Sequence, residues 1–377
     1  MGNNKQYHVK IDHNELREKT GANLHHIKGR GTAVNIKNRF EQLEYTGLDE
    51  SCEYFEEDDD KKPQTTYFRD HTKSLINKVD SPDLGMMYSM NPYRGCEHGC
   101  IYCYARPTHE YLGFNAGLDF ETKIMVKPDA PKVLAEEFNK SKWKPEVVVM
   151  SGNTDCYQPL ERKLEITRQC LEVFLKFRNP VAIITKNALV QRDIDLLKQL
   201  AELNLVRVIV SITSLRPEIT NVMEPRTARP QRRLETVKRL TDNGIPVSVN
   251  AAPIIPGLTD EELPAILKAA ADAGAISAGL TLVRLPWQNK DLFIEWVKRE
   301  FPDRAEKILN RVSEIHGGRL YNSEYHKRMS GQGKWAETIH NVFDTYKAKY
   351  RLNKKSPPLR KDLFRRIKDD DQFGLFR

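Results

Sequence analysis

The sequence contains no long hydrophobic run and few cysteines. Across its 377 residues, no stretch approaches the roughly 20 apolar residues that a membrane-spanning helix requires. The amino-terminal segment also lacks the apolar stretch of a secretory signal, so we expect a cytoplasmic protein without membrane contact. The six cysteines do not suggest a secreted disulfide framework, because three of them fall within eight residues. Such clustering indicates a bound metal.

The net charge of the chain and the composition of its two ends do not identify a binding partner. Sixty basic and 52 acidic residues give a net charge of +8, which permits a polyanionic partner without requiring one. Residues 1–80 are polar and show little apolar periodicity, so we expect a mostly irregular amino-terminal arm. Residues 351–377 are basic and interrupted by prolines, which indicates a partly ordered tail. A tail of this composition can simply be solvated, or it can contact nucleic acid. The sequence is consistent with both interpretations.

The sequence pattern changes between residues 81 and 288. Short β-branched runs alternate with stretches of helical periodicity, in units of near 30 residues. This spacing predicts an α/β fold built from parallel strand-helix units. We expect strands near 86–92 and at 147–150, 181–185, 206–212, 247–252 and 277–283, and helices at 130–140, 161–178, 190–203, 229–243 and 260–273. About six units are visible, fewer than the eight of a complete barrel. Residues 289–350 predict a helical carboxyl-terminal extension, with helices at 289–300, 303–316 and 335–350.

The most informative segment is a cysteine loop that follows the first predicted strand. Cys96, Cys100 and Cys103 are spaced so that three thiolates can bind three irons of a cuboidal cluster, leaving the fourth iron open for reaction. Gly95 and Gly99 would let the backbone pass close to such a cluster. The loop also lies at the end of a strand where parallel α/β folds place their active sites.

A structural metal site is the alternative interpretation of the same loop. His98 or His109 could complete a zinc site with the three cysteines, and a structural iron–sulfur cluster is also possible. Zinc ligands usually come as two separated pairs, which the remaining cysteines do not supply. Of these, Cys52 and Cys170 are expected to be free thiols.

The motifs around this loop resemble those of a known family. The three cysteines with Tyr102 before the third are similar to the signature of the radical S-adenosylmethionine (SAM) superfamily. The segments NPYRGCEHGCIYCYARPTHEYLG, LDFETKIMVKP, NTDCYQPLE and MEPRTARPQRRL resemble an uncharacterised bacterial branch related to spore photoproduct lyase. The resemblance covers roughly residues 25–290.

The resemblance implies a partial (β/α)6 TIM-type barrel that binds a 4Fe–4S cluster and S-adenosyl-L-methionine. In this family, an electron delivered by a reductant of the flavodoxin or ferredoxin type cleaves the cosubstrate, and the resulting 5′-deoxyadenosyl radical abstracts hydrogen. An enclosed site protects that radical from solvent.

The resemblance also assigns cosubstrate contacts to residues at the ends of the predicted strands. Gly152, Asn153 and Thr154 match the segment that accepts the methionyl amine, although an ordinary turn has the same composition. Lys186, Ser211 and Thr213 match residues that contact the cosubstrate. Arg226 is a candidate for a carboxylate or substrate anion, or for a salt bridge to Glu224. Ile255 and Val283 match the adenine-packing positions, where core packing is the alternative.

Two residues are candidates for returning a hydrogen atom to a product radical. Cys156 carries a thiol close to the second strand end, but alignment of Thr154-Asp155 with the related lyase places Gly152 at the donor position. Tyr104 matches a tyrosine of that enzyme's hydrogen relay, or covers the cluster. The family resemblance therefore does not carry over the lyase reaction itself.

Three function classes follow from the sequence. The first is a radical enzyme acting on nucleic acid, similar to a DNA repair lyase, which the basic tail and net charge favour. The second is a radical enzyme acting on a protein or small metabolite, with the helical extension as a lid. The third is a structural zinc or iron–sulfur protein. The sequence indicates no oligomeric state.

Overall fold

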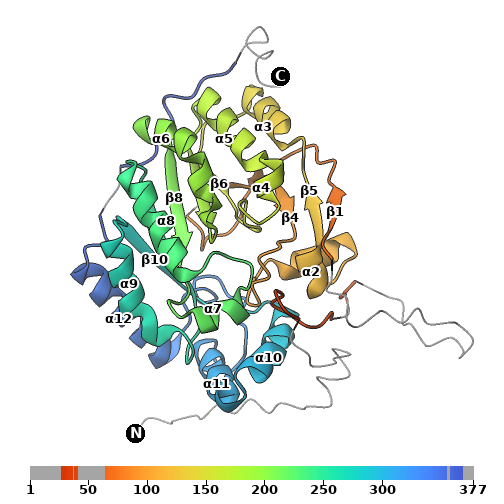
Figure 1. Ribbon diagram of the computed structural model, residues 1–377, viewed down its shortest axis with the longest axis vertical. Coiled ribbons are helices and arrows are strands. Elements are labelled where there is room, and N and C mark those ends of the chain that lie inside the picture. Colours follow the sequence, from red (N-terminus) through yellow and green to blue (C-terminus); the bar gives the residue numbers. More distant parts are fainter. Residues whose placement is uncertain (1–26, 37, 41–63, 86, 355–356, 368–377) are drawn as a thin grey trace, which may run out of the picture.

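The structure is a computed structural model, which describes residues 27–36, 38–40, 64–85, 87–354 and 357–367 (Figure 1). Expectations for the remaining residues, including Cys52, lie outside the described part of the chain. Among the described residues, no helix is long and apolar enough to cross a membrane.

A sheet of parallel strands forms the centre of the fold. In the described chain, six parallel strands follow one another in the order β3-β6-β7-β8-β9-β10. Their bounds are β3 Tyr88–Met90, β6 Val148–Met150, β7 Val181–Thr185, β8 Val206–Ser211, β9 Val247–Ile254 and β10 Ser277–Leu282. The runs of β6 and β7 are buried almost without interruption, as expected for parallel strands covered on both faces, whereas β3, β8, β9 and β10 include half-buried positions. The predicted α/β fold with a partial barrel is confirmed.

Helices cover the outer face of this sheet (Figure 1). They are α3 Ala130–Asn139, α5 Ile166–Phe177, α6 Ile194–Glu202, α8 Pro230–Asp242 and α9 Leu263–Asp272, with the shorter α4 Glu161–Leu164, η2 Ala188–Asp193 and η3 Asp260–Glu262 before three of them. The carboxyl-terminal helices are α10 Asn289–Glu300, η4 Pro302–Arg304, α11 Ala305–Ile315 and α12 Gly333–Lys349. Helices α10 and α11 lie with α7 (Pro217–Met223) at the end toward which strand β8 points (Figure 1).

A second, smaller sheet stands beside the barrel. It pairs β1 Thr66–Arg69 in parallel with β5 Lys123–Val126, which in turn pairs with β4 Tyr93–Arg94. The helices η1 Arg106–Leu112 and α2 Leu118–Thr122 precede β5. Strand β1 and the short β2 (Asn77–Lys78), which pairs with β3, both fall within the segment expected to be mostly irregular. Their shortness explains why no periodicity revealed them.

One segment after α11 connects the two edges of the open barrel. The backbone amide of Leu282, on β10, donates to the carbonyl of Met329 at 2.9 Å. The neighbouring Arg328 pairs through Nε with Asp83 at 2.5 Å and donates through Nη2 to Ser81 at 2.7 Å, both ahead of β3. Residues 328–329 therefore connect β10 to the segment that precedes β3.

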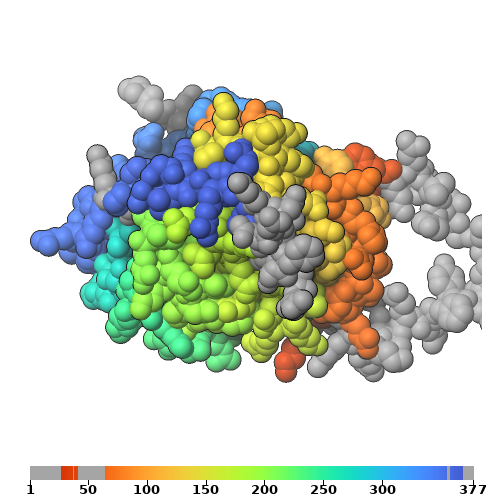
Figure 2. All heavy atoms as spheres, turned by 90° about the horizontal axis from the view of Figure 1, so that it is seen from above, coloured from red at the N-terminus to blue at the C-terminus, as the bar shows by residue number. Residues whose placement is uncertain are grey.

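The described part of the basic tail packs against the barrel end opposite the carboxyl ends of the strands. The backbone amide of Arg365 donates to the carbonyl of Phe177 before β7, and that of Arg360 donates to Asn204 before β8, both at 3.0 Å. The Phe364 ring lies 6.2 Å from that of Phe138 in the core. Figure 2 shows this blue segment lying across the surface of the barrel.

We expect the substitution Phe138→Ala to lower the free energy of unfolding by about 3–5 kcal/mol, because it opens a cavity in the core. The Phe138 side chain is fully buried and its ring lies 5.4 Å from Phe174 and 5.5 Å from Phe177. Urea unfolding followed by circular dichroism measures the change. The control Glu136→Ala changes an exposed residue of the same helix and should stay within about 0.5 kcal/mol of the parent. Equal losses in both variants would contradict this packing.

Candidate active site

A cavity of about 450 Å³ opens at the carboxyl ends of the parallel strands. The ends of all six strands and the cysteine loop contribute to its lining. Its volume is in the range of sites for small molecules and cofactors. Of the residues predicted from the sequence, it is lined by Cys96, Cys100, Tyr102, Cys103, Tyr104, Gly152, Asn153, Lys186 and Ser211.

The cysteine loop runs between β4 and η1 and is held by a buried ion pair. Arg106, whose side chain is fully buried, donates through Nε to the Cys100 carbonyl at 2.9 Å and pairs with Glu121 at 2.5 Å. Glu121 also accepts from the backbone amides of Gly31 at 3.1 Å and Thr32 at 3.2 Å. The ion pair therefore fixes the loop against both η1 and the segment around residue 31.

Gly99 is required for the close packing around this ion pair. Its φ of +68° lies in the left-handed region, and a Cβ at this position would stand 2.7 Å from Glu121 Oε2. The loop backbone can therefore approach the buried carboxylate only because the residue has no side chain.

The thiols of Cys96 and Cys100 lie at the cavity in surroundings that disfavour free thiolates. Burial, together with Asp155, raises the pKa of Cys96 well above its usual value. Burial also raises the pKa of Cys100 to about 12, partly offset by Lys186. A metal that binds such thiols displaces their protons, because the thiolate is the ligand. Three sulfur donors next to an open cavity fit an iron–sulfur cluster with one iron accessible.

The two histidines considered as zinc ligands make other contacts. The amide of Asn187 lies 3.0 Å from His98 Nε2, and Nδ1 of the same ring lies 3.4 Å from the Asp155 carboxylate. Burial lowers the His98 pKa to about 4, so the ring is neutral. The His109 Nε2 lies 2.9 Å from the carbonyl of Lys123. Within the described ranges, no group of three or more His, Cys, Asp or Glu side chains is arranged to hold a single ion. The histidine contacts therefore give the zinc alternative no support.

Two polar side chains connect the ends of neighbouring strands. Asn91, after β3, accepts from the backbone amides of Asn153 at 2.9 Å and Thr154 at 3.3 Å. Asp155 accepts at 2.8 Å both from the Thr185 hydroxyl and from the Lys186 backbone amide, at the end of β7. These bonds hold Asn153 and Lys186 at the cavity wall. Sequence reasoning missed both roles, although each residue stands at a strand end.

A buried charged network lies close to Cys100, the second cysteine of the loop. Glu224 pairs with Arg233 at 2.6 Å and accepts hydrogen bonds from the hydroxyls of Thr213 and Tyr102. Burial alone would raise the Glu224 pKa, but Arg233 and Lys186 hold it below the usual value. Burial opposes the charge of Lys186 as well, yet Cys100 and Glu224 raise the pKa of this lysine. Lys186 is therefore a cation at the cavity wall.

The two predicted threonines use their hydroxyls elsewhere. Thr154 is buried and donates through Oγ1 to the Tyr93 carbonyl at 2.7 Å, while Thr213 donates to Glu224 at 2.6 Å. Neither lines the cavity. Both hold the framework on which Asn153 and Ser211 are placed.

Three further predicted residues also lie outside the cavity lining. Arg226 pairs with Glu97 at 3.2 Å rather than with Glu224. Ile255 and Val283 are fully buried in an apolar cluster that also contains Cys100 and Tyr102. Among the residues of the fifth-strand exit, Ala252 and Pro253 line the cavity instead.

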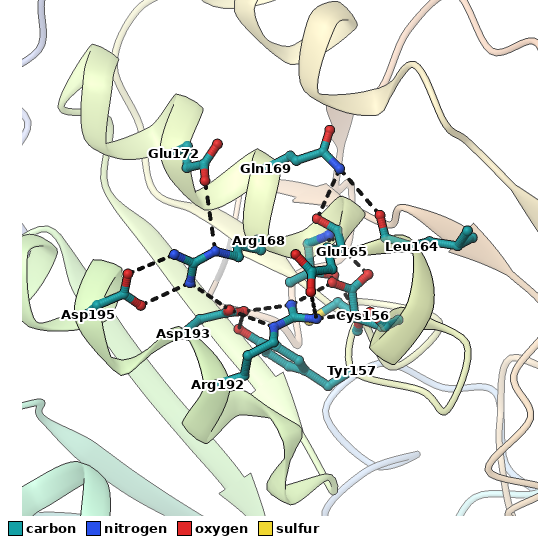
Figure 3. A network of polar contacts seen from close by, with 12 residues as sticks. Cys156, Tyr157, Leu164, Glu165, Arg168, Gln169, Glu172, Arg192, Asp193 and Asp195 are labelled. Carbon is teal, nitrogen blue, oxygen red and sulfur yellow. Dashed lines mark hydrogen bonds and ion pairs between the residues drawn. The ribbon is translucent and has the colours of Figure 1, made fainter. Parts of the chain in front are cut away.

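The two hydrogen-return candidates differ in position. The Cys156 thiol is fully buried in the main core and does not line the cavity, and burial raises its pKa well above the usual value. Figure 3 shows Cys156 beside the network of Arg192 and Asp193. Tyr104 lines the cavity, and its hydroxyl donates to the Gly152 carbonyl.

Two arginines at the cavity were missed from the sequence. The Arg284 guanidinium lies 4.1 Å from the centre of the Tyr104 ring and has no ion pair among the residues described. Burial lowers the pKa of Arg284, and the nearby charge of Arg328 lowers it further. Arg284 follows β10 by two residues, so its strand-end position could have identified it. Arg328 comes from outside the strand-helix repeat and had no such signal.

Comparison with known proteins gives the family. Residues 90–270 match the Radical SAM superfamily. An uncharacterized protein of Mycobacterium tuberculosis is 35% identical over 247 residues, which cover 65% of this chain and 72% of that protein. An uncharacterized protein of Methanocaldococcus jannaschii is 31% identical over 190 residues, covering 50% of this chain and 68% of that one. The chain belongs to the radical SAM superfamily.

A solved structure shares the fold. Spore photoproduct lyase complexed with dinucleoside spore photoproduct aligns with a TM-score of 0.55 and 16% sequence identity, covering 76% of this chain and 79% of that one. At this identity the likeness concerns the architecture. Superfamily membership implies an enzyme that uses a 4Fe–4S cluster, S-adenosylmethionine and an external reductant.

We expect Glu121→Ala to lower the free energy of unfolding of the metal-free protein by about 3–5 kcal/mol, because it leaves the buried Arg106 charge without its partner. The control Asp195→Ala removes one carboxylate from Arg168, where Asp193 remains (Figure 3). The Asp195 side chain is 56% exposed, so its loss should cost about 0–1 kcal/mol. Urea titration measures both variants. A cost for Glu121→Ala no larger than that of the control would contradict the assigned role.

Proposed function

We propose that Cys96, Cys100 and Cys103 bind a 4Fe–4S cluster and that the protein reductively cleaves S-adenosylmethionine in the adjoining cavity. The observation that carries the proposal is the convergence of these three thiols with Lys186, Asn153 and Ser211 on one cavity. When bound, the cluster supplies the electron that breaks a sulfur–carbon bond of the cosubstrate, giving methionine and a 5′-deoxyadenosyl radical.

The side chains of the cavity would bind and orient the cosubstrate. The Lys186 cation suits the methionyl carboxylate, and Asn153 with the neighbouring backbone of Gly152 suits the amine. Ser211 can donate to a ribose or carboxylate oxygen. Ala252 and Pro253 offer an apolar surface for the adenine ring. Tyr104 is better placed than Cys156 for hydrogen return, because only Tyr104 of the two lines the cavity.

We expect the anaerobically reconstituted, reduced protein to form 5′-deoxyadenosine from S-adenosylmethionine. Cys96→Ser should abolish this product and lower iron and acid-labile sulfide, because one of three cluster ligands is lost. The matched control Cys170→Ser changes a buried thiol of α5 and should retain the cluster. Liquid chromatography and metal analysis measure both. A protein that binds one zinc and no sulfide would contradict the proposal.

We further propose a nucleic acid as substrate, with radical modification of a protein or small metabolite as the alternative. Arg284 supports the choice, because it presents a cation without an ion-pair partner among the described residues at a cavity that adjoins the thiols. The related fold of spore photoproduct lyase, described with a dinucleoside, agrees with it. The basic tail adds no support, since its described residues pack at the opposite end of the barrel.

We expect Arg284→Gln to weaken retention of single- or double-stranded DNA or RNA about 3- to 10-fold at low salt, and to lower the salt dependence of binding. Fluorescence anisotropy over a series of salt concentrations measures both quantities. Lys132→Gln, an exposed residue of α3, is the control of equal charge change. Absence of nucleic-acid binding at low salt would favour a protein or metabolite substrate.

A further inference from the structure

A second hollow lies beside the cysteine loop. This basic groove has a volume of about 620 Å³ and is lined by residues including Arg162, Lys163, Asn187, Arg192, Arg226 and Arg232. Of the described residues that line it, five are basic and none is acidic. It is formed by α4, η2 and the segment that leads into α8, and it shares no lining residue with the cavity.

The positive charge of the groove is concentrated at two exposed residues. Arg192 is neutralised by Glu161 at 2.8 Å. It also pairs with Asp193 at 2.8 Å (Figure 3). Two other arginines of the groove also have acidic partners, Glu97 for Arg226 and Glu235 for Arg232. Arg162 and Lys163 are exposed and form no ion pair with any residue that the structure describes. These two cations are free to meet acidic groups of a partner.

Two residues of the groove contact His98 of the cysteine loop. Asn187 lines the groove and its amide lies 3.0 Å from His98 Nε2, while the backbone amide of Arg226 donates to the His98 carbonyl at 3.3 Å. His98 itself lines the cavity. Lys186 faces the cavity, and the next residue, Asn187, faces the groove. One residue of the loop therefore separates a partner in the groove from the proposed cluster site.

From these contacts we propose that the basic groove is the docking surface for an acidic one-electron carrier protein. The inference rests on the proposed radical function, which needs an external electron. At this surface the carrier gives up one electron and the cluster accepts it, and no proton or atom moves. Complementary charge on the two surfaces accelerates encounter and orients the carrier toward the loop.

The position of the groove favours a carrier over a nucleic acid. A nucleic-acid substrate must bring its reacting atom into the cavity, with which the groove shares no lining residue. A protein carrier needs only a compact basic patch close to the loop.

The test uses the double variant Arg162→Glu/Lys163→Glu of the full-length, cluster-loaded protein. The control Lys142→Glu/Lys144→Glu reverses two exposed lysines before β6 and changes the net charge equally. A flavodoxin, a small acidic flavoprotein, is the probe. Calorimetry with oxidised flavodoxin measures affinity, and stopped-flow absorbance with reduced flavodoxin measures cluster reduction. Dithionite, which needs no docking surface, provides a second reductant.

The groove variant should bind flavodoxin about 10-fold more weakly and be reduced by it about 10-fold more slowly at low ionic strength, with the difference shrinking as salt is added. Its reduction by dithionite, and every property of the control, should match the parent. Equal flavodoxin binding by both variants would overturn the inference. So would loss of DNA retention with unchanged flavodoxin binding, which would assign the groove to nucleic acid. Failure of dithionite to support 5′-deoxyadenosine formation in the parent would instead contradict the radical function, while calorimetry would still decide whether the groove binds the carrier.

Discussion

The buried ion pair between Arg106 and Glu121 is the constraint on which the site depends. A guanidinium and a carboxylate without solvent exposure stabilise a fold only when their hydrogen bonds are nearly all satisfied. Here the additional donors and acceptors are backbone groups of the cysteine loop, of the turn before α2 and of the segment near residue 31. The cost of burying the charges is thus offset by fixing three backbone segments at once. Without these bonds, the cysteine loop, with its short spacers and glycines, would be free to adopt many conformations.

The strand ends give the loop its second support. Asp155 links the turn after β6 to the end of β7 and stands 3.4 Å from His98 of the loop. The Asp155 carboxylate therefore contacts three segments of the chain. A shift of any of these segments would move the carboxylate and change the position of Lys186. The three cysteines of the loop line the cavity, whereas His98 of the loop is contacted by Asn187 and Arg226 of the groove. This division separates the place where a cosubstrate fits from the place where a protein partner can approach.

Sequence patterns predicted the strands and the cysteine loop because both are local signals. The run Val181–Thr185 is apolar and bounded by turns, and Lys186 follows it directly at the edge where parallel strands place functional groups. Local sequence patterns did not predict where the hydroxyls of the threonines at the strand ends would point. Thr154 and Thr213 turn to Tyr93 and Glu224, partners far away in sequence that appear only when the chain is folded. Arg328 was equally hidden, because it reaches the cavity from beyond α11.

The connection made by Arg328 and Met329 has a consequence for the cavity. A complete eightfold barrel closes by a continuous ladder of backbone bonds. Here the Leu282 amide of β10 donates to Met329, and Arg328 with the His326 backbone amide binds Asp83 in the segment before β3. A ladder joins two strands along their whole length, whereas this connection consists of a few contacts made by residues 326–329. Arg328 also lines the cavity, so the closing connection of the barrel and the wall of its cavity share one side chain.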